Sequence, residues 1–290
     1  MDERWSDVRT PDGVRLAVRE IHGSPAGAPG LLLHHGLASS QRIWDLMLPR
    51  LARRFRVVTY DARGHGRSGK PSSGFGFDIT VADAMTVSRA TRLRRPIMAG
   101  HSWGAMVTLE SAVRHPRALA GAFLIDGGVT ALRREMTWPE VKERLAPPHL
   151  AGMHVEEFRR LIRTFWSETL EVTPDIERIV LALMHVNADG RIRPHLSRSN
   201  HFRILRAIWE QDPMALHARL RVPTVALLAH RSGDPAHAGW EVAKRRTAAD
   251  LHRMGAPTRI EWIEGIHDLP LQQPDPLAAR IERFAGAAVR

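Results

Sequence analysis

The stretch AGHSWGAM, residues 99–106, places Ser102 between two glycines, with a histidine before the serine and a tryptophan after it. This spacing fits the pattern G-x-S-x-G, which in catalytic sites marks a sharp turn from a strand into a helix. The apolar run PIMAGH (96–101) precedes the serine, and helical periodicity begins near Trp103. Because strand and helix pass very close at such a turn, the two flanking positions must lack bulk. We therefore predict that Ser102 is exposed as a nucleophile, with the N–H of Trp103 aimed at an incoming carbonyl oxygen.

Short apolar runs alternate with helical periodicities along most of the chain. This alternation predicts an α/β fold in which helices flank a mostly parallel sheet. A hairpin is expected around the turn-like PDG at 11–13. Strands buried on both faces are expected at GLLLHH (30–35), RVVTYD (56–61), PIMAGH (96–101), GAFLID (121–126), TVALLAH (224–230) and RIEWIE (259–264). Helices are expected at 41–54, 79–93, 103–115, 238–254 and 275–288.

One long segment breaks this rhythm. Residues 129–212 show no strand-like run, only helical material such as VEEFRRLIRTFW and IERIVLALMHV, interrupted by prolines. We therefore expect residues 1–128 and 213–290 to form the core, with 129–212 inserted as an all-helical cap, or lid.

A serine nucleophile needs a base from elsewhere in the chain. Among sixteen histidines, His267 in EGIHDLPLQQPD follows the last expected strand, and a loop at that sheet edge can reach back to Ser102. His101, adjacent to the serine, lies on the strand side. Packing or a local hydrogen bond is the expected role of His101.

The acid that orients the imidazole should follow a late core strand, and two aspartates qualify. Asp234, in LLAHRSGDP, follows the penultimate strand by a short loop. Asp126, in FLIDGG, ends the strand just before the insertion. Both positions face the same sheet edge, so the sequence does not separate them. We favour Asp234 and keep Asp126 as the alternative.

The strand GLLLHH runs into His35, Gly36 and Leu37. In this turn the backbone N–H of Leu37 is placed to provide a second oxyanion donor. Removing one such donor typically lowers turnover by about 10² to 10³.

These motifs together resemble the α/β-hydrolases that carry a helical cap. The resemblance covers nearly the whole chain, through LLHHG (32–36), TYDARGHGRSG (59–69), GHSWG (100–104) and GIHDLPLQQP (265–274). It implies a catalytic triad in which Ser102 is the nucleophile, His267 the base and Asp234 the usual acid. Relatives that place the acid one strand earlier keep Asp126 as the alternative. The resemblance also implies that Leu37 and Trp103 form the oxyanion hole.

Composition excludes several classes. The chain has 290 residues and no cysteine, which removes disulfides, thiolate catalysis and cysteine metal sites. No H-E-x-x-H or Walker pattern is present, so no metal or nucleotide cofactor is expected. The acidic start MDERWSD does not resemble a secretory signal. The apolar runs are far shorter than the roughly 20 residues that cross a bilayer. We expect a cytoplasmic protein with no membrane partner.

The net charge of +11 raises the question of a nucleic-acid partner, but the arginines are spread in short groups that indicate solvated helix faces. We therefore expect no nucleic-acid partner. The cap carries 13 basic against 12 acidic residues, so an anionic substrate is not indicated. A serine esterase or lactonase acting on a small to medium, largely neutral molecule is expected. Amide or C–C bond hydrolysis, or acyl transfer and cyclisation in a biosynthetic pathway, through the same triad is the alternative. A non-catalytic protein that binds a ligand or nucleic acid is the least favoured interpretation, because the serine, the base and an acid are all present. His35, Phe165, Trp166 and Trp209 are candidate substrate contacts. The oligomeric state stays open.

Overall fold

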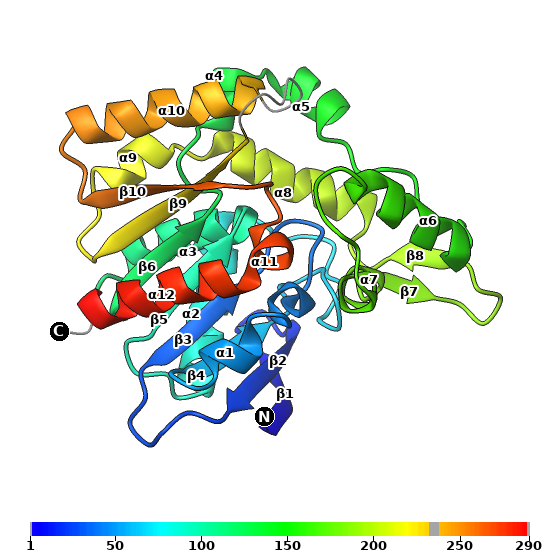
Figure 1. The fold of residues 1–290 in the computed structure, drawn as a ribbon, viewed down its shortest axis with the longest axis horizontal. Helices are drawn as coiled ribbons and strands as arrows, with labels where there is room; N and C mark the ends of the chain where they lie inside the picture. The colour runs from blue at the N-terminus through cyan, green and yellow to red at the C-terminus, as the bar shows by residue number, and fades with distance from the viewer. Residues whose placement is uncertain (1, 232–237, 289–290) are drawn as a thin grey trace.

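The computed structural model describes residues 2–231 and 238–288, and a twisted eight-stranded sheet runs through it (Figure 1). The strands are β1 (Asp2–Arg9), β2 (Arg15–His22), β3 (Gly30–His34), β4 (Arg56–Tyr60), β5 (Ile97–His101), β6 (Gly121–Ile125), β9 (Thr224–His230) and β10 (Thr258–Glu264). Their order across the sheet is β1-β2-β4-β3-β5-β6-β9-β10. Only the pairings of β1 with β2 and of β2 with β4 are antiparallel. The mostly parallel sheet expected from the sequence is confirmed.

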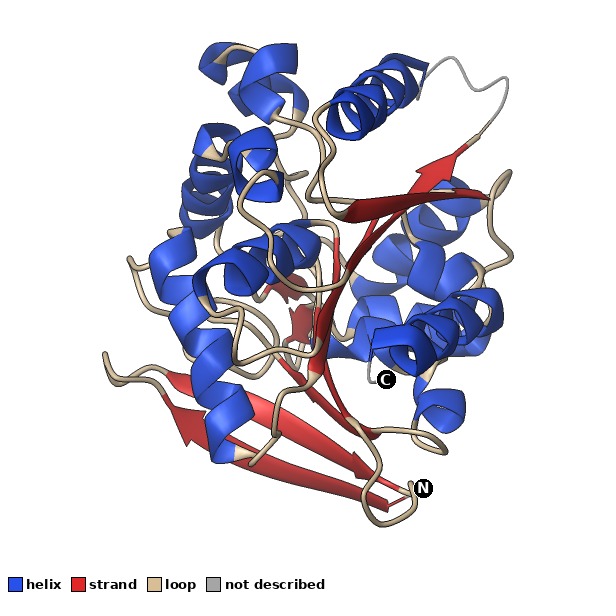
Figure 2. Cartoon of the chain, turned by 90° about the vertical axis from the view of Figure 1, so that its left-hand side faces the viewer, coloured by secondary structure: helices blue, strands red, loops and turns tan. Residues whose placement is uncertain are grey.

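Helices cover both faces of this sheet (Figure 2). The core helices are η1 (Gln41–Trp44, a 3₁₀ helix), α1 (Leu48–Leu51), α2 (Phe77–Ala90), α3 (Trp103–Arg114), α9 (Pro213–His217), α10 (Ala238–Arg253), α11 (Leu269–Gln272) and α12 (Pro274–Ala288). The segment 41–54 was expected as one helix, and it forms η1 and α1 instead. Pro49 is the reason, because it stands at the start of α1 and proline begins a helix more readily than it continues one. Within the described ranges, no helix is both long and apolar enough to cross a membrane.

The central strands bury side chains on both faces, as their continuous apolar sequences predict. In β3, Leu31 and Leu33 join the apolar cluster that includes α1 and α12, whereas Leu32 joins the cluster that includes α2 and α3. All three leucines have no exposed surface. The edge strand β10 differs from the expectation, because most of its residues are exposed or half-buried. As the last strand of the sheet it has a neighbour on one side only.

The helices of the segment 129–212, which was expected to form the cap, lie to the right and top in Figure 1. They are α4 (Leu132–Glu135), α5 (Trp138–Arg144), α6 (Val155–Trp166), α7 (Pro174–Leu181) and α8 (Arg198–Glu210). The segment also contains an antiparallel hairpin of β7 (Met184–Val186) and β8 (Ile192–Pro194), so it is not helical throughout. Gly190, with φ of +77°, makes the turn between the two strands. Strands of three residues are too short to show an alternating pattern in the sequence.

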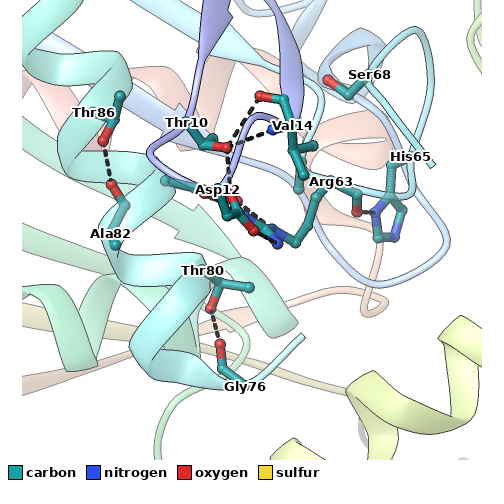
Figure 3. A network of polar contacts seen from close by, with 12 residues as sticks. Thr10, Asp12, Val14, Arg63, His65, Ser68, Gly76, Thr80, Ala82 and Thr86 are labelled. Carbon is teal, nitrogen blue, oxygen red and sulfur yellow. Dashed lines mark hydrogen bonds and ion pairs between the residues drawn. The ribbon is translucent and has the colours of Figure 1, made fainter. Parts of the chain in front are cut away.

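The loop after β4 is held by a buried arginine. The guanidinium of Arg63 makes two hydrogen bonds to Asp83, at 2.6 and 2.8 Å, and two to Asp12, at 2.9 and 3.1 Å. Figure 3 shows the Arg63 side chain reaching Asp12 in the β1–β2 turn, while its main-chain carbonyl accepts from His65. The side chain of Arg63 is 1% exposed, so these partners satisfy a charge that water cannot reach. The loop is thereby fixed beside the strand ends that carry the candidate site.

Candidate active site

Ser102 lies at the sharp turn between β5 and α3. Its backbone adopts φ of 56° and ψ of −119°, a left-handed conformation that is costly for a residue with a side chain. The Ser102 N–H donates to the carbonyl oxygen of Ile125 at 2.9 Å, which ties the turn to the end of β6. The surrounding fold thus holds the serine in a strained turn that presents its side chain at the carboxyl edge of the sheet.

The two flanking glycines have the steric role that the sequence predicts. A Cβ atom on Gly100 would lie 2.5 Å from Thr108 Oγ1 and closer still to the carbonyl oxygen of Gly104. A Cβ atom on Gly104 would lie 2.6 Å from the carbonyl oxygen of His35. These separations are well below normal nonbonded contact. Only glycine lets α3 pass this close to β3 and β5.

The loop after β3 is held rigidly by two buried histidines. His35 donates through Nδ1 to the carbonyl of Gly36 at 2.8 Å and accepts through Nε2 from the N–H of Ala62 at 2.9 Å. His65 donates through Nδ1 to Arg63 O and accepts through Nε2 from Ala38 N–H at 3.3 Å. Burial lowers the pKa of both rings, so both are neutral and make these paired contacts. Ala38, at φ of +55°, completes the turn.

The sequence predicts two backbone N–H groups at this edge of the sheet as oxyanion donors. The N–H of Leu37 follows the rigid loop, and the N–H of Trp103 is the first of α3. Neither donates to an acceptor within residues 2–231 and 238–288. The Trp103 indole is buried and packs on His34 and His65, with ring centroids 5.0 and 5.4 Å apart, so its backbone is well anchored. These two groups are the oxyanion donors expected from the sequence, and their role stays a proposal.

His267 follows β10 and contacts Asp126 directly. Its Nδ1–H donates to Asp126 Oδ2 at 2.6 Å, while its carbonyl accepts from His101 Nε2 at 2.8 Å. The His267 side chain is 47% exposed, whereas that of Asp126 is 1% exposed. Asp126 itself sits at φ of +45°, at the end of β6. The structure therefore brings together the histidine and the alternative acid, across 141 residues of sequence.

Asp234, the acid favoured from the sequence, lies outside the described residues. The carboxylate that meets the Nδ1–H of His267 in the structure is Asp126. The neighbouring Gly127 explains how β6 comes so near the serine: a Cβ atom there would lie 3.0 Å from Ser102 Cα and nearer to its carbonyl. Close packing of the backbone at Gly127 against the backbone at Ser102 thus places Asp126 at the same part of the sheet edge as the serine.

The electrostatics of the pair favour a charged acid and a basic imidazole. Burial alone would raise the pKa of Asp126, but the hydrogen bond from His267 and the charge of Lys244 hold it well below its ordinary value. Desolvation works against a protonated His267, yet the hydrogen bond and charge of Asp126 raise its pKa above the ordinary value. Burial lowers the pKa of His101 to about 4, so this ring is neutral and donates through Nε2. His101 thus makes a local hydrogen bond that holds the His267 loop.

Ser102 and His267 open onto one cavity of about 570 Å³ between the sheet edge and the cap. Its lining is mostly apolar but also includes the charged residues Asp126, Arg231, Glu241 and Lys244. Its volume is in the range of pockets that bind small molecules. Apolar side chains come from the core and from the cap, among them Met106, Val129, Leu132, Leu145, Pro147, Leu205, Ile208 and Trp240. Leu37 is also among the residues that line this cavity.

The four substrate contacts expected from the sequence lie elsewhere. Among the described residues, the cavity lining includes none of them. His35 is fully buried at the start of the loop after β3. Phe165 is 73% exposed on the outside of α6, and Trp166 packs partly buried against the cap interior. Trp209 donates its indole N–H to Met136 O at 2.8 Å and packs on Trp138. Helical periodicity places such residues on a face but does not say which face meets the cavity.

Sequence reasoning missed one charged residue at the site. Lys244 of α10 contacts Asp126 with its Nζ atom 2.6 Å from Oδ1. One signal was available: Lys244 is one of only three lysines in a chain whose basic residues are otherwise arginine. No cluster of three or more potential metal ligands occurs in the part of the chain that the structure describes.

Comparison with known proteins agrees with this architecture. A family model described as "alpha/beta hydrolase fold" matches residues 29–170. A protein named "Putative non-heme haloperoxidase", from Mycobacterium phage D29, is 30% identical over 94% of this chain and 92% of its own length. "Putative carbamate hydrolase RutD" from Agrobacterium fabrum is 36% identical over 110 residues, which cover 37% of this chain and 42% of that protein. This chain therefore aligns with less than half of that second relative.

A solved structure extends the likeness over the whole fold. The crystal structure of E-2-(acetamidomethylene)succinate hydrolase matches with a TM-score of 0.79 at 19% identity, covering 98% of this chain and 100% of that one. The chain belongs to the alpha/beta hydrolase fold family. It is an enzyme of the hydrolase class that this family defines.

Proposed function

We propose that the enzyme is a serine hydrolase that cleaves a carboxylic ester or lactone of a small to medium, largely neutral substrate through an acyl-enzyme. The observation that carries this proposal is the Asp126–His267 hydrogen bond of 2.6 Å beside a strained Ser102 at the same apolar cavity. Two backbone N–H groups at that edge supply the remaining part of an acyl-transfer site.

Each group has a defined role in this mechanism. His267, held by Asp126 through Nδ1, keeps Nε2 available to accept the Ser102 hydroxyl proton. The Ser102 oxygen attacks the acyl carbon, and the N–H groups of Leu37 and Trp103 stabilise the negative charge that develops on the carbonyl oxygen. Asp126 stays ionised and stabilises the imidazolium.

The reaction is then completed in two steps, formation of the acyl-enzyme and its hydrolysis. As the tetrahedral centre collapses, the bond from the acyl carbon to the leaving oxygen breaks and His267 returns the proton to that oxygen. Water attacks the acyl-enzyme, His267 takes a proton from it, and the acid is released while Ser102 regains its hydrogen. No external oxidant or metal enters this sequence.

The cavity supports a neutral substrate. Its lining is mainly apolar, and the cationic Lys244 that reaches it is already paired with Asp126. Glu241, at the same wall, is paired with Arg245 at 2.7 Å. Because the opposite charges within each pair partly cancel, these two pairs present little net charge to a substrate. An uncharged acyl group is the better match to this surface.

Hydrolysis of p-nitrophenyl esters of increasing chain length tests the proposal. Wild-type protein is compared with Ser102→Ala, and circular dichroism checks that both are folded. Turnover that falls by about 10⁴-fold or more in the variant is expected if Ser102 is the nucleophile. Equal turnover in both proteins would rule the proposal out.

Amide or carbamate cleavage by the same groups is a second candidate, favoured by the name of the relative that is 36% identical over 110 residues. Matched esters, lactones, anilides and carbamates with the same acyl group separate the two. The ester proposal predicts the highest kcat/KM for an ester or lactone. A higher kcat/KM for the anilide or carbamate would favour the second candidate.

A further inference from the structure

The Asp126 carboxylate has a second partner besides His267. Lys244 Nζ donates to Asp126 Oδ1 at 2.6 Å and to the carbonyl oxygen of Ala229 at 2.9 Å. The N–H of Ala229 donates to the same Oδ1 at 2.9 Å. Among residues 2–231 and 238–288, Oδ1 thus has two donors, one of them charged, and Oδ2 accepts from His267. Three elements, β6, β9 and α10, meet at this one carboxylate.

Lys244 differs from its neighbours on α10. The next two residues, Arg245 and Arg246, pair with Glu241 and Glu135 at the surface and are more than half exposed. The Lys244 side chain is only 18% exposed and reaches inward. A lysine ammonium is a compact charge that donates to several acceptors at one point, which suits two oxygens close together.

We propose that Lys244 is a positioning residue of the triad, which fixes the Asp126 carboxylate through Oδ1, partly offsets its charge, and thereby sets the pH range in which His267 acts as base. This inference rests on the proposed serine hydrolase function. Lys244 does so without touching the reacting atoms, because it acts through Asp126.

The charged groups around His267 decide the direction of the effect. Asp126 directly follows β6 and Asp268 is next to His267 in the sequence, and both favour the protonated ring. Lys244 on α10 opposes it, while His101 on β5 is neutral, with its ring 4.8 Å away.

Two further charged side chains line the same cavity wall, Glu241, paired with Arg245, and Arg231. Lys244 is the cation that bonds Asp126 directly among the described residues. Without Lys244, the uncompensated Asp126 charge raises the pKa of His267 further.

The test follows the second-order rate of phosphonylation by a fluorophosphonate between pH 5 and pH 9, which reports the base of the free enzyme. Lys244→Met is expected to move the acidic midpoint upward by about one pH unit, the effect of losing one nearby charge. Lys244→Gln keeps hydrogen-bond donors without charge and is expected to move the midpoint the same way. Lys244→Arg keeps the charge and is expected to retain the wild-type midpoint.

Arg253→Met is the matched control, because it removes a charge from the far end of α10, where the Arg253 side chain is 71% exposed. This variant is expected to keep the wild-type midpoint. Thermal melting checks that each variant is folded at the assay temperature. If Lys244→Met is unfolded, Lys244→Gln is used in its place. Wild-type midpoints in a folded charge-removing variant, or an equal shift in Lys244→Arg, would overturn the inference. Absence of labelling in the wild type would instead overturn the proposed function itself.

Discussion

Gly104→Ala tests whether the close approach of α3 to β3 positions the nucleophile. The added Cβ would lie 2.6 Å from His35 O, about 0.9 Å short of the roughly 3.5 Å of normal nonbonded contact, and it would lie closer still to His34 O. The atom in its way is backbone, at the start of the loop that His35 and Ala62 hold. The start of α3 must therefore move by roughly 1 Å or more, and with it Ser102 and the N–H of Trp103.

A misplacement of about 1 Å typically lowers catalytic rates by about 10²-fold. Overpacking of this kind costs about 1–3 kcal/mol, which for a chain of this size lowers Tm by roughly 2–12 °C. We therefore expect the Gly104→Ala enzyme to fold but to lose about 10²-fold in kcat/KM for a p-nitrophenyl ester. Steady-state kinetics with the p-nitrophenyl ester measure kcat/KM, and thermal melts measure Tm.

Gly286→Ala is the matched control. Gly286 lies in α12, and a Cβ atom there meets nothing within 4 Å. Alanine in a helix is more stable than glycine by about 1 kcal/mol at most, so this variant should keep wild-type activity and melt no lower than the wild type. Wild-type kcat/KM in a folded Gly104→Ala protein would refute the steric argument.

Three further predictions concern Asp126, His267 and Arg63. Asp126→Asn is expected to lower kcat by about 10⁴-fold, because the amide no longer enforces the imidazole tautomer; ester kinetics check this, and loss of less than tenfold would count against Asp126 as the acid. The acidic limb of kcat/KM should have its midpoint above pH 6.5, because the raised pKa of His267 keeps the base protonated to higher pH, and activity should fall as pH drops through that midpoint; a midpoint below pH 6.5 would contradict it. Arg63→Met should lower the free energy of unfolding by about 3–5 kcal/mol in urea titration, because it leaves the buried Asp83 without its counterion; a change below 1 kcal/mol would show that the pair does not stabilise the fold.

The sequence predicts the elements that depend on local pattern. The tight turn of G-x-S-x-G brings the backbones at Gly100 and Gly104 close to their neighbours, which only glycine permits. The presence of glycine at both positions is therefore enough to predict the turn. Continuous apolar runs likewise predict strands such as β3 and β5, since residues such as Leu31 and Leu32 are buried on opposite faces.

The candidate acid depends on long-range packing that local pattern does not record. Asp126 and Asp234 both follow strands that end at the same edge, and the sequence does not say which carboxylate turns toward His267. The positive φ of Asp126 and its hydrogen bond to Lys244, 118 residues away, form only after β6, β9 and α10 have packed together. The faces of the cap helices are equally non-local, which is why Phe165 and Trp209 are found outside the cavity.

Mass-spectrometric mapping after treatment with a fluorophosphonate identifies the nucleophile of the enzyme. We expect one covalent adduct per chain, on the Ser102 oxygen, formed in the native enzyme and absent after denaturation. An adduct on a different residue, or no adduct on the folded protein, would contradict the assignment of Ser102 as a nucleophile activated by His267 and Asp126.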